Sequence, residues 1–299
     1  MFTQFFGNYL LNNEYVTINQ LVEAFELQKT VKLKLGVLAI NAGYMTASQV
    51  DKVHKMQSKI DKRFGAIAIE MGYLTDGQVG ELLKSQKTGY LLLGQALVNK
   101  GYMTNDQFQN AIENYKKEHK IKDTDFTLSQ NEKMLEIIED FYDFDSFEDA
   151  GLYTEYVSLL FKNIVRFVGD DFTPLKSIVF EEFECTNFTS QTIEGEFNVY
   201  TAFECDDDTF VKFASRFSQE DYTENDEYVK ASVSEFMNLN NGIFCVNMSN
   251  ANRMELELTP QVIDFNKTLT KVRNAFCIPI RFSFGTINFL IIGNMPTII

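Results

Sequence analysis

The sequence predicts two domains of different fold class: an all-α helical repeat domain, followed by an α+β domain whose helices pack on a largely antiparallel sheet. Two observations lead to this prediction. One phrase of 29 residues occurs four times before residue 120, and helical and strand-like patterns are mixed after residue 148. The segment between them is rich in acidic residues. We therefore predict a repeat domain at 1–120, an acidic linker with a helical segment at 121–147, and an α+β domain at 148–299.

The repeat is defined by four glycines at a constant interval of 29 residues: Gly7, Gly36, Gly65 and Gly94. A tyrosine, a threonine and a glutamine follow each glycine at matching positions. A fixed period between 20 and 50 residues is typical of stacked supersecondary units, none of which buries its apolar face alone. We expect four such units.

Each unit is predicted to be a short helix, a tight turn and a longer helix. In three copies the turn carries a glycine (Gly43, Gly72, Gly101), which suits a left-handed residue at a helix C-terminus. Glu14 takes its place in the first copy. Three residues later every copy has Thr-x-x-Gln, the pattern of a capping box that begins a second helix.

The copy with Arg63-Phe64-Gly65, Gly72-Tyr73-Leu74 and Gln86 resembles the repeated motif in the N-terminal domain of type II secretion and pilus ATPases (MshEN type). The resemblance implies that the repeats bind cyclic di-GMP, with the arginine before the Leu-Gly pair contacting a guanine. Arg63 matches that arginine and Lys34 replaces it in the second copy, although an ammonium lacks the planar fork of a guanidinium. The other interpretation is a structural or protein-binding helical array.

Composition excludes several classes of function. With only two histidines, His54 and His119, a histidine-based metal site or catalytic triad is not expected, and we predict no intrinsic cofactor. Residues 121–299 carry 31 Asp and Glu against 13 Lys and Arg, which disfavours nucleic acid as a partner. We see neither a membrane span nor a secretory signal, and so expect a cytoplasmic protein without membrane insertion.

Hydrophobic periodicity places the elements of the second half. We expect helices at 153–169, 208–218 and 226–248, besides one at 131–141 in the linker. We expect strands at 176–188, 193–205, 252–259, 273–284 and 286–293.

This order resembles the CheX/CheC-type phosphatases of chemotaxis, which mark an active helix with Asp or Ser, three residues, and then Glu-x-x-Asn. The stretch "KASVSEFMNLNNGIF" supplies Glu235 and Asn238, and Pro260 follows at nearly the family's spacing, but Ala231 replaces the Asp or Ser. The resemblance implies hydrolysis of the phospho-aspartate of a response regulator. Asn238 would position the water and Glu235 would grip a lysine of the regulator, which would itself hold Mg²⁺.

Helical geometry supports this interpretation of the motif. At 100° per residue, Ala231, Glu235, Asn238 and Gly242 share the side of the helix opposite its apolar residues. A second Glu-x-x-Asn, from Glu184 to Asn187, falls in a predicted strand.

The leading hypothesis is a cytosolic signalling protein that couples a helical sensing or docking module to a phosphatase-like domain acting on a phosphorylated receiver domain. The alternatives are a non-catalytic adaptor or homodimerisation protein, and a cyclic di-GMP effector acting through Lys34 and Arg63.

Overall fold

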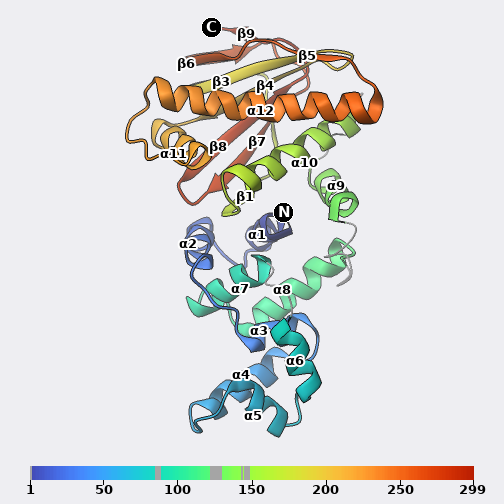
Figure 1. The fold of residues 1–299 in the computed structure, drawn as a ribbon, viewed down its shortest axis with the longest axis vertical. Helices are drawn as coiled ribbons and strands as arrows, with labels where there is room; N and C mark the ends of the chain where they lie inside the picture. The colour runs from blue at the N-terminus through green and yellow to red at the C-terminus, as the bar shows by residue number, and fades with distance from the viewer. Residues whose placement is uncertain (1, 85–88, 122–129, 143, 145–148) are drawn as a thin grey trace. The chain divides into compact units, whose positions relative to one another are not determined.

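The computed structural model describes residues 2–84, 89–121, 130–142, 144 and 149–299. The chain divides into two compact units, residues 2–129 and residues 130–299, each of which is described by itself (Figure 1). Among the described residues, no helix has the length and apolar character needed to cross a bilayer.

The N-terminal unit consists of helix pairs. In chain order they are α1 (Phe2–Asn12) with α2 (Ile18–Gln28), α3 (Leu35–Asn41) with α4 (Ala47–Gln57), α5 (Phe64–Glu70) with α6 (Asp76–Lys84), and α7 (Gly89–Asn99) with α8 (Asn105–Glu118).

Each second helix begins at the predicted capping box. At Thr75, for example, the backbone N–H of Gln78 donates to the Thr75 hydroxyl (3.2 Å). The backbone N–H of Thr75 donates in turn to Oε1 of the Gln78 side chain (2.9 Å). The turn glycines adopt left-handed angles, with φ of 69° to 72°, and Glu14 adopts a similar φ of 57°. The turn conformation is therefore kept in the first copy despite the cost of a side chain there.

The helix pairs do not pack strictly in the order of the chain, as a linear stack would require. Helices α1 and α2 pack on α7 of the fourth pair, and α3 contacts α7 and α8 as well as its neighbours α5 and α6. Aromatic rings carry part of this contact: the Phe6 ring meets Tyr90 of α7 at 5.9 Å and Tyr115 of α8 at 5.2 Å. The first and fourth copies thus bury each other.

Three of the four periodic glycines are explained by close approach of other side chains. A Cβ atom built on Gly36 would lie 2.7 Å from Val50, and one built on Gly65 would lie 3.1 Å from Leu35. On Gly94 it would lie 1.9 Å from the ring of Phe108, which is fully buried. A glycine in the first helix therefore allows this close packing.

The C-terminal unit is an antiparallel sheet with helices. Its strands are β1 (Phe172–Pro174), β2 (Ile178–Val179), β3 (Phe183–Gly195), β4 (Val199–Cys205), β5 (Leu256–Leu258), β6 (Val262–Thr270), β7 (Ala275–Phe282), β8 (Gly285–Ile292) and β9 (Thr297–Ile298). The main order is β1-β7-β8-β4-β3-β6-β9, while β2 pairs with β7 and β5 with β3. The described pairings are antiparallel, as predicted.

The helices of this unit are α9 (Gln130–Phe141), α10 (Ala150–Phe167), α11 (Asp207–Ser218) and α12 (Glu227–Asn252). Helix α12 packs on β3 and α11 packs on α12 (Figure 1). Helix α9, which we assigned to a linker, packs on α10 within the C-terminal unit.

Several strand predictions need correction. The run 176–188 is divided between β2, which pairs with β7, and β3, which pairs with β4 and β6. The short strands β1 and β9 were not predicted. The run 193–205 is not one strand, because a turn after Gly195 separates β3 from β4. Gly195 has a φ of 129°, and the Asn198 side chain closes the turn by donating to the Gly195 carbonyl (3.0 Å). Strand β6 was not predicted, although it pairs with β3 along most of its length.

We predict opposite effects for two Gly→Ala substitutions in the repeats. Gly94→Ala should lower the free energy of unfolding by about 1–3 kcal/mol, because the new methyl group overlaps the buried Phe108 ring. Gly80→Ala, in α6 with no atom within 4 Å of the new Cβ, should raise it by roughly 0.5–1 kcal/mol. Amide hydrogen exchange of α6 to α8 in the full chain measures both; equal effects would contradict the packing explanation.

Candidate functional site

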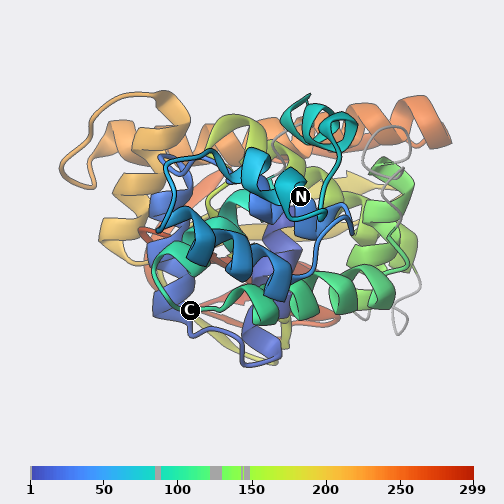
Figure 2. The same cartoon turned by 90° about the horizontal axis from the view of Figure 1, so that it is seen from below.

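The candidate site lies on α12, a single uninterrupted helix of 26 residues (Figures 1 and 2). It begins where the Asp226 side chain accepts hydrogen bonds from the amides of Tyr228 and Val229, and it ends at Arg253, whose φ is 59°. A carboxylate N-cap and a left-handed C-terminal residue are ordinary helix boundaries. Glu235 and Asn238 therefore lie less than one turn apart on one rigid element.

The two sides of α12 differ as the periodicity predicts. The side toward the core holds Val229, Val233 and Phe236, all fully buried. On the other side Ala231 and Glu235 are exposed, whereas Asn238 and Gly242 are half-buried. The outer ridge, defined as Ala231, Glu235, Asn238 and Gly242, thus presents one carboxylate and one amide between positions with little or no side chain.

Ser232, the residue beside the missing Asp or Ser, does not belong to the outer ridge. Its hydroxyl donates to the Ala214 carbonyl of α11 (3.4 Å). The second Glu-x-x-Asn does not form a comparable pair, because Glu184 and Asn187 lie three residues apart on β3 and so point to opposite faces of the sheet.

The Asn238 side chain is hydrogen-bonded to a residue of β3, the strand on which α12 packs. Gln191 Nε2 donates to Asn238 Oδ1 (3.1 Å) and to the Thr259 carbonyl (2.9 Å). Gln191 is 3% exposed. The loop that carries Thr259 and the exposed Pro260 is thereby joined to the outer ridge through one glutamine.

A buried polar network continues beneath this contact. Asn241 Nδ2 donates to Gln191 Oε1 (2.9 Å) and to Thr201 Oγ1 (3.1 Å). The Tyr156 hydroxyl donates to Asn241 Oδ1 (2.5 Å), and burial raises the pKa of Tyr156 well above its ordinary value. The tyrosine is protonated at physiological pH, as an ordinary tyrosine is, and its hydroxyl can act as the donor.

Sequence reasoning missed Gln191 and Asn241. One signal was available: Gln191 alternates with Thr189 and Ile193 on the helix-covered face of β3, where an apolar residue is expected. Asn240 and Asn241 follow Asn238 closely and are both fully buried, so the cluster of asparagines combines one surface group with two core groups.

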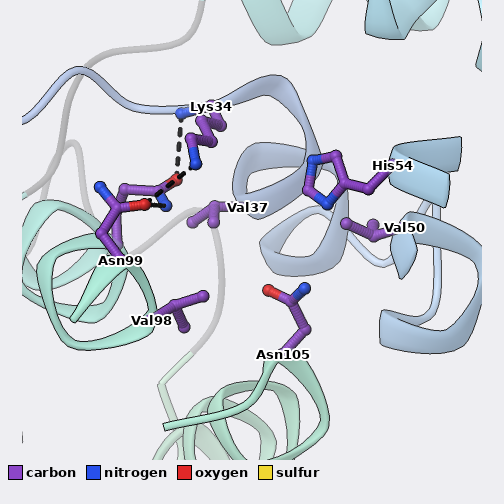
Figure 3. A pocket seen from close by; sticks show the side chains of 8 residues that line it. Lys34, Val37, Val50, His54, Val98, Asn99 and Asn105 are labelled. Atoms are coloured by element: carbon purple, nitrogen blue, oxygen red, sulfur yellow. Dashed lines mark hydrogen bonds between the residues drawn. The ribbon is translucent and has the colours of Figure 1, made fainter. Parts of the chain in front are cut away.

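In the N-terminal unit, Lys34 lines a pocket of about 240 Å³ between the second and fourth helix pairs (Figure 3). Its ammonium donates to Asn99 Oδ1 (3.0 Å), which also accepts from Gln95 (2.9 Å). His54 and Asn105 line the opposite side. The pocket is smaller than the volumes of about 300–1,000 Å³ usual for small-molecule sites.

One cation and one carboxylate act on this pocket: Lys34 lines it, and Asp51 accepts from Asn105 Nδ2 (2.7 Å) and opposes the lowering of the pKa of His54. Among the described residues no carboxylate lies within ion-pair distance of Lys34. Burial, and secondarily the Lys34 charge, lower the pKa of His54. Arg63 is exposed at the N-cap of α5 and does not line this pocket, so the two cyclic di-GMP candidates are not brought together there.

No group of three or more His, Cys, Asp or Glu side chains is arranged to hold a metal ion in the part of the chain that the structure describes.

Comparison with known proteins finds structural likeness over about half of the chain. No family model and no curated protein matches the sequence. A CheC-like superfamily protein of Shewanella sp. PV-4 is 14% identical and matches 47% of this chain and 96% of its own, with a TM-score of 0.42. The chemotaxis protein CheX of Desulfovibrio desulfuricans is 14% identical over 47% of this chain and 97% of its own, with a TM-score of 0.41.

CheX of Borrelia burgdorferi, solved in a complex with CheY, BeF3 and Mg²⁺, is likewise 14% identical. It matches 48% of this chain and 96% of its own, with a TM-score of 0.39.

We predict that Tyr156→Phe destabilises the C-terminal unit by about 1–3 kcal/mol, because it leaves the buried carbonyl of Asn241 without its donor. Tyr228→Phe, on the outside of α12 with 74% of the residue exposed, is the matched control and should stay within about 0.5 kcal/mol of the parent. Amide exchange of α12 and β3 measures the difference. Equal protection in both variants would show that the hydrogen bond from Tyr156 to Asn241 contributes no stability.

Proposed function

We propose that the C-terminal unit hydrolyses the phospho-aspartate of a response-regulator receiver domain. The observation that carries the proposal is the outer ridge: Glu235 and Asn238 project from one rigid helix, and Ala231 and Gly242 leave the backbone beside them accessible. A partner surface can approach such a ridge closely. The proposal requires no nucleophile or general base in this chain.

The proposed reaction is an in-line displacement by water. The water oxygen forms a bond to phosphorus while the bond from phosphorus to the aspartate oxygen breaks, and the carboxylate of the regulator leaves with the bonding pair. One water proton stays on the new oxygen and the other passes to a phosphoryl oxygen, giving dihydrogen phosphate. The transition state has little covalent chemistry for a protein to assist, so positioning of the water by Asn238 is the proposed contribution.

Glu235 has a different proposed role. In the described part of the chain, no cationic group lies within ion-pair distance of its exposed carboxylate. The carboxylate is therefore available to a lysine beside the phosphoryl group of the partner, and an ammonium–carboxylate hydrogen bond would fix the docking register. The regulator, not this chain, would hold the Mg²⁺ that neutralises the phosphoryl charge.

We predict that Asn238→Ala lowers kcat for dephosphorylation on the order of 10²-fold, because the attacking water is no longer oriented. Asn247→Ala is the matched control: Asn247 is an exposed asparagine of the same helix, outside the outer ridge. Loss of phosphate from a phosphorylated regulator in Mg²⁺ is the measurement.

In the same assay Glu235→Gln should raise KM about tenfold or more and leave kcat less affected, since it removes a docking charge. Glu227→Gln, on the first turn of α12, controls for the change in net charge. Activity of Asn238→Ala equal to that of the parent would contradict the mechanism.

A non-catalytic adaptor or homodimer is the second candidate, and the edge of the sheet favours it. Strand β6 pairs with β9 only at Leu269 and Thr270, and exposes Val262 (46%), Ile263 (41%) and Phe265 (59%). An open strand edge with apolar side chains is suited to pairing with another strand. Two results together would support the adaptor: the parent binds the regulator without hydrolysing its phosphate, and a Glu235→Ala/Asn238→Ala variant binds the regulator equally well.

Cyclic di-GMP binding by the repeats is the third candidate, favoured by the lysine of the N-terminal pocket. We predict that any binding heat seen by calorimetry at micromolar cyclic di-GMP is lost in Lys34→Ala, because the phosphate would lose its cationic partner. Lys52→Ala, an exposed lysine of α4, is the matched control. Binding that persists in Lys34→Ala and is lost in Arg63→Ala would place the ligand at Arg63 instead.

A further inference from the structure

The amide of Asn238 reaches the surface at the end of a chain of buried side-chain hydrogen bonds. We propose that Gln191 is a positioning residue that turns this amide so that Oδ1 faces β3 and Nδ2 faces solvent. The effect on the reaction rate rests on the function proposed above, whereas the orientation of Asn238 does not.

The inner end of the chain is fixed by a backbone carbonyl. The Thr201 hydroxyl donates to the Gln191 carbonyl (2.9 Å), an obligate acceptor, so its single proton is used. Toward Asn241, Thr201 Oγ1 can then only accept. Asn241 must present its NH₂ group to Thr201, and its oxygen therefore lies toward the Tyr156 hydroxyl.

The orientation of Gln191 follows from that of Asn241. The same NH₂ group of Asn241 donates to Gln191 Oε1, which leaves Gln191 Nε2 on the side of Asn238 and Thr259. The outer end is again a backbone carbonyl, Thr259 O, which can only accept. If the Gln191 amide were flipped, its NH₂ group would face the NH₂ group of Asn241, and its oxygen would face the Thr259 carbonyl. The two backbone carbonyls, of Gln191 and of Thr259, therefore specify one orientation of the Gln191 side chain.

This orientation determines what Asn238 offers at the surface. Its oxygen accepts from Gln191, and in the described part of the chain no residue accepts from its Nδ2. Two N–H donors are therefore available beside the Glu235 carboxylate. The attacking water would accept from Nδ2 with one lone pair and present the other to phosphorus, a geometry that a freely rotating amide would hold only part of the time.

The test compares two buried substitutions on the same face of β3. Gln191→Met keeps the side-chain length but donates to neither Asn238 nor Thr259. Thr189→Val, the matched control, removes the buried Thr189–Ser234 hydrogen bond (2.8 Å) between the same strand and helix without contacting Asn238. We expect Gln191→Met to lower kcat by about tenfold to 10²-fold with KM unchanged, and Thr189→Val to change neither.

A second readout follows Asn238 directly. The order parameter of its Nδ2 group, from ¹⁵N relaxation of the full chain, should lie near that of rigid backbone (roughly 0.85) in the parent and in Thr189→Val, and fall below about 0.6 in Gln191→Met. If Gln191→Met does not fold, Gln191→Leu, which likewise has no side-chain donor, is used in its place.

The two readouts separate the two claims. If the parent hydrolyses no regulator phosphate, the proposed function fails, and the order parameter alone then decides whether Gln191 positions Asn238. If the order parameter of Asn238 Nδ2 is unchanged in a folded Gln191 variant, the positioning role is overturned, whatever the activity of that variant. If the parent is active and the Gln191 variant has the same kcat, the positioning role is overturned as well.

Discussion

The structure of the C-terminal unit depends on how α12 is held against β3. Apolar side chains such as Val233 and Phe236 provide the buried area and bring one side of the helix to the sheet. The hydrogen bonds from Gln191 to Asn238 and from Asn241 to Gln191 join the same two elements, and a buried amide left without them would be destabilising. The polar contacts that connect the helix to β3 thus include the one to the surface asparagine.

A different constraint governs the repeats. A periodic glycine in the first helix of a unit allows the close approach of another side chain, most tightly the Phe108 ring on Gly94. Because the first and fourth pairs also bury each other through Phe6, Tyr90 and Tyr115, the array closes on itself rather than extending. The pocket at Lys34 results from this closure, since its walls come from pairs that are not adjacent in the chain.

Local signals in the sequence predicted the elements whose physics is local. The capping boxes, the turn glycines and the two sides of α12 follow from residues a few positions apart. The turn at Gly195 and the strand β6 were missed because alternation alone does not reveal where a strand reverses. Gln191 was missed because its hydrogen-bond partners, Thr201, Asn241 and Thr259, are distant in the sequence and only the fold brings them together.

The central claim is that the outer ridge of α12 removes a phosphoryl group from another protein. The most direct measurement is the rate at which a labelled acyl phosphate is lost from receiver domains of the same organism, with and without this protein, in Mg²⁺. The account predicts faster loss for at least one receiver, proportional to the amount of protein added. Loss at the spontaneous rate for every receiver would contradict it.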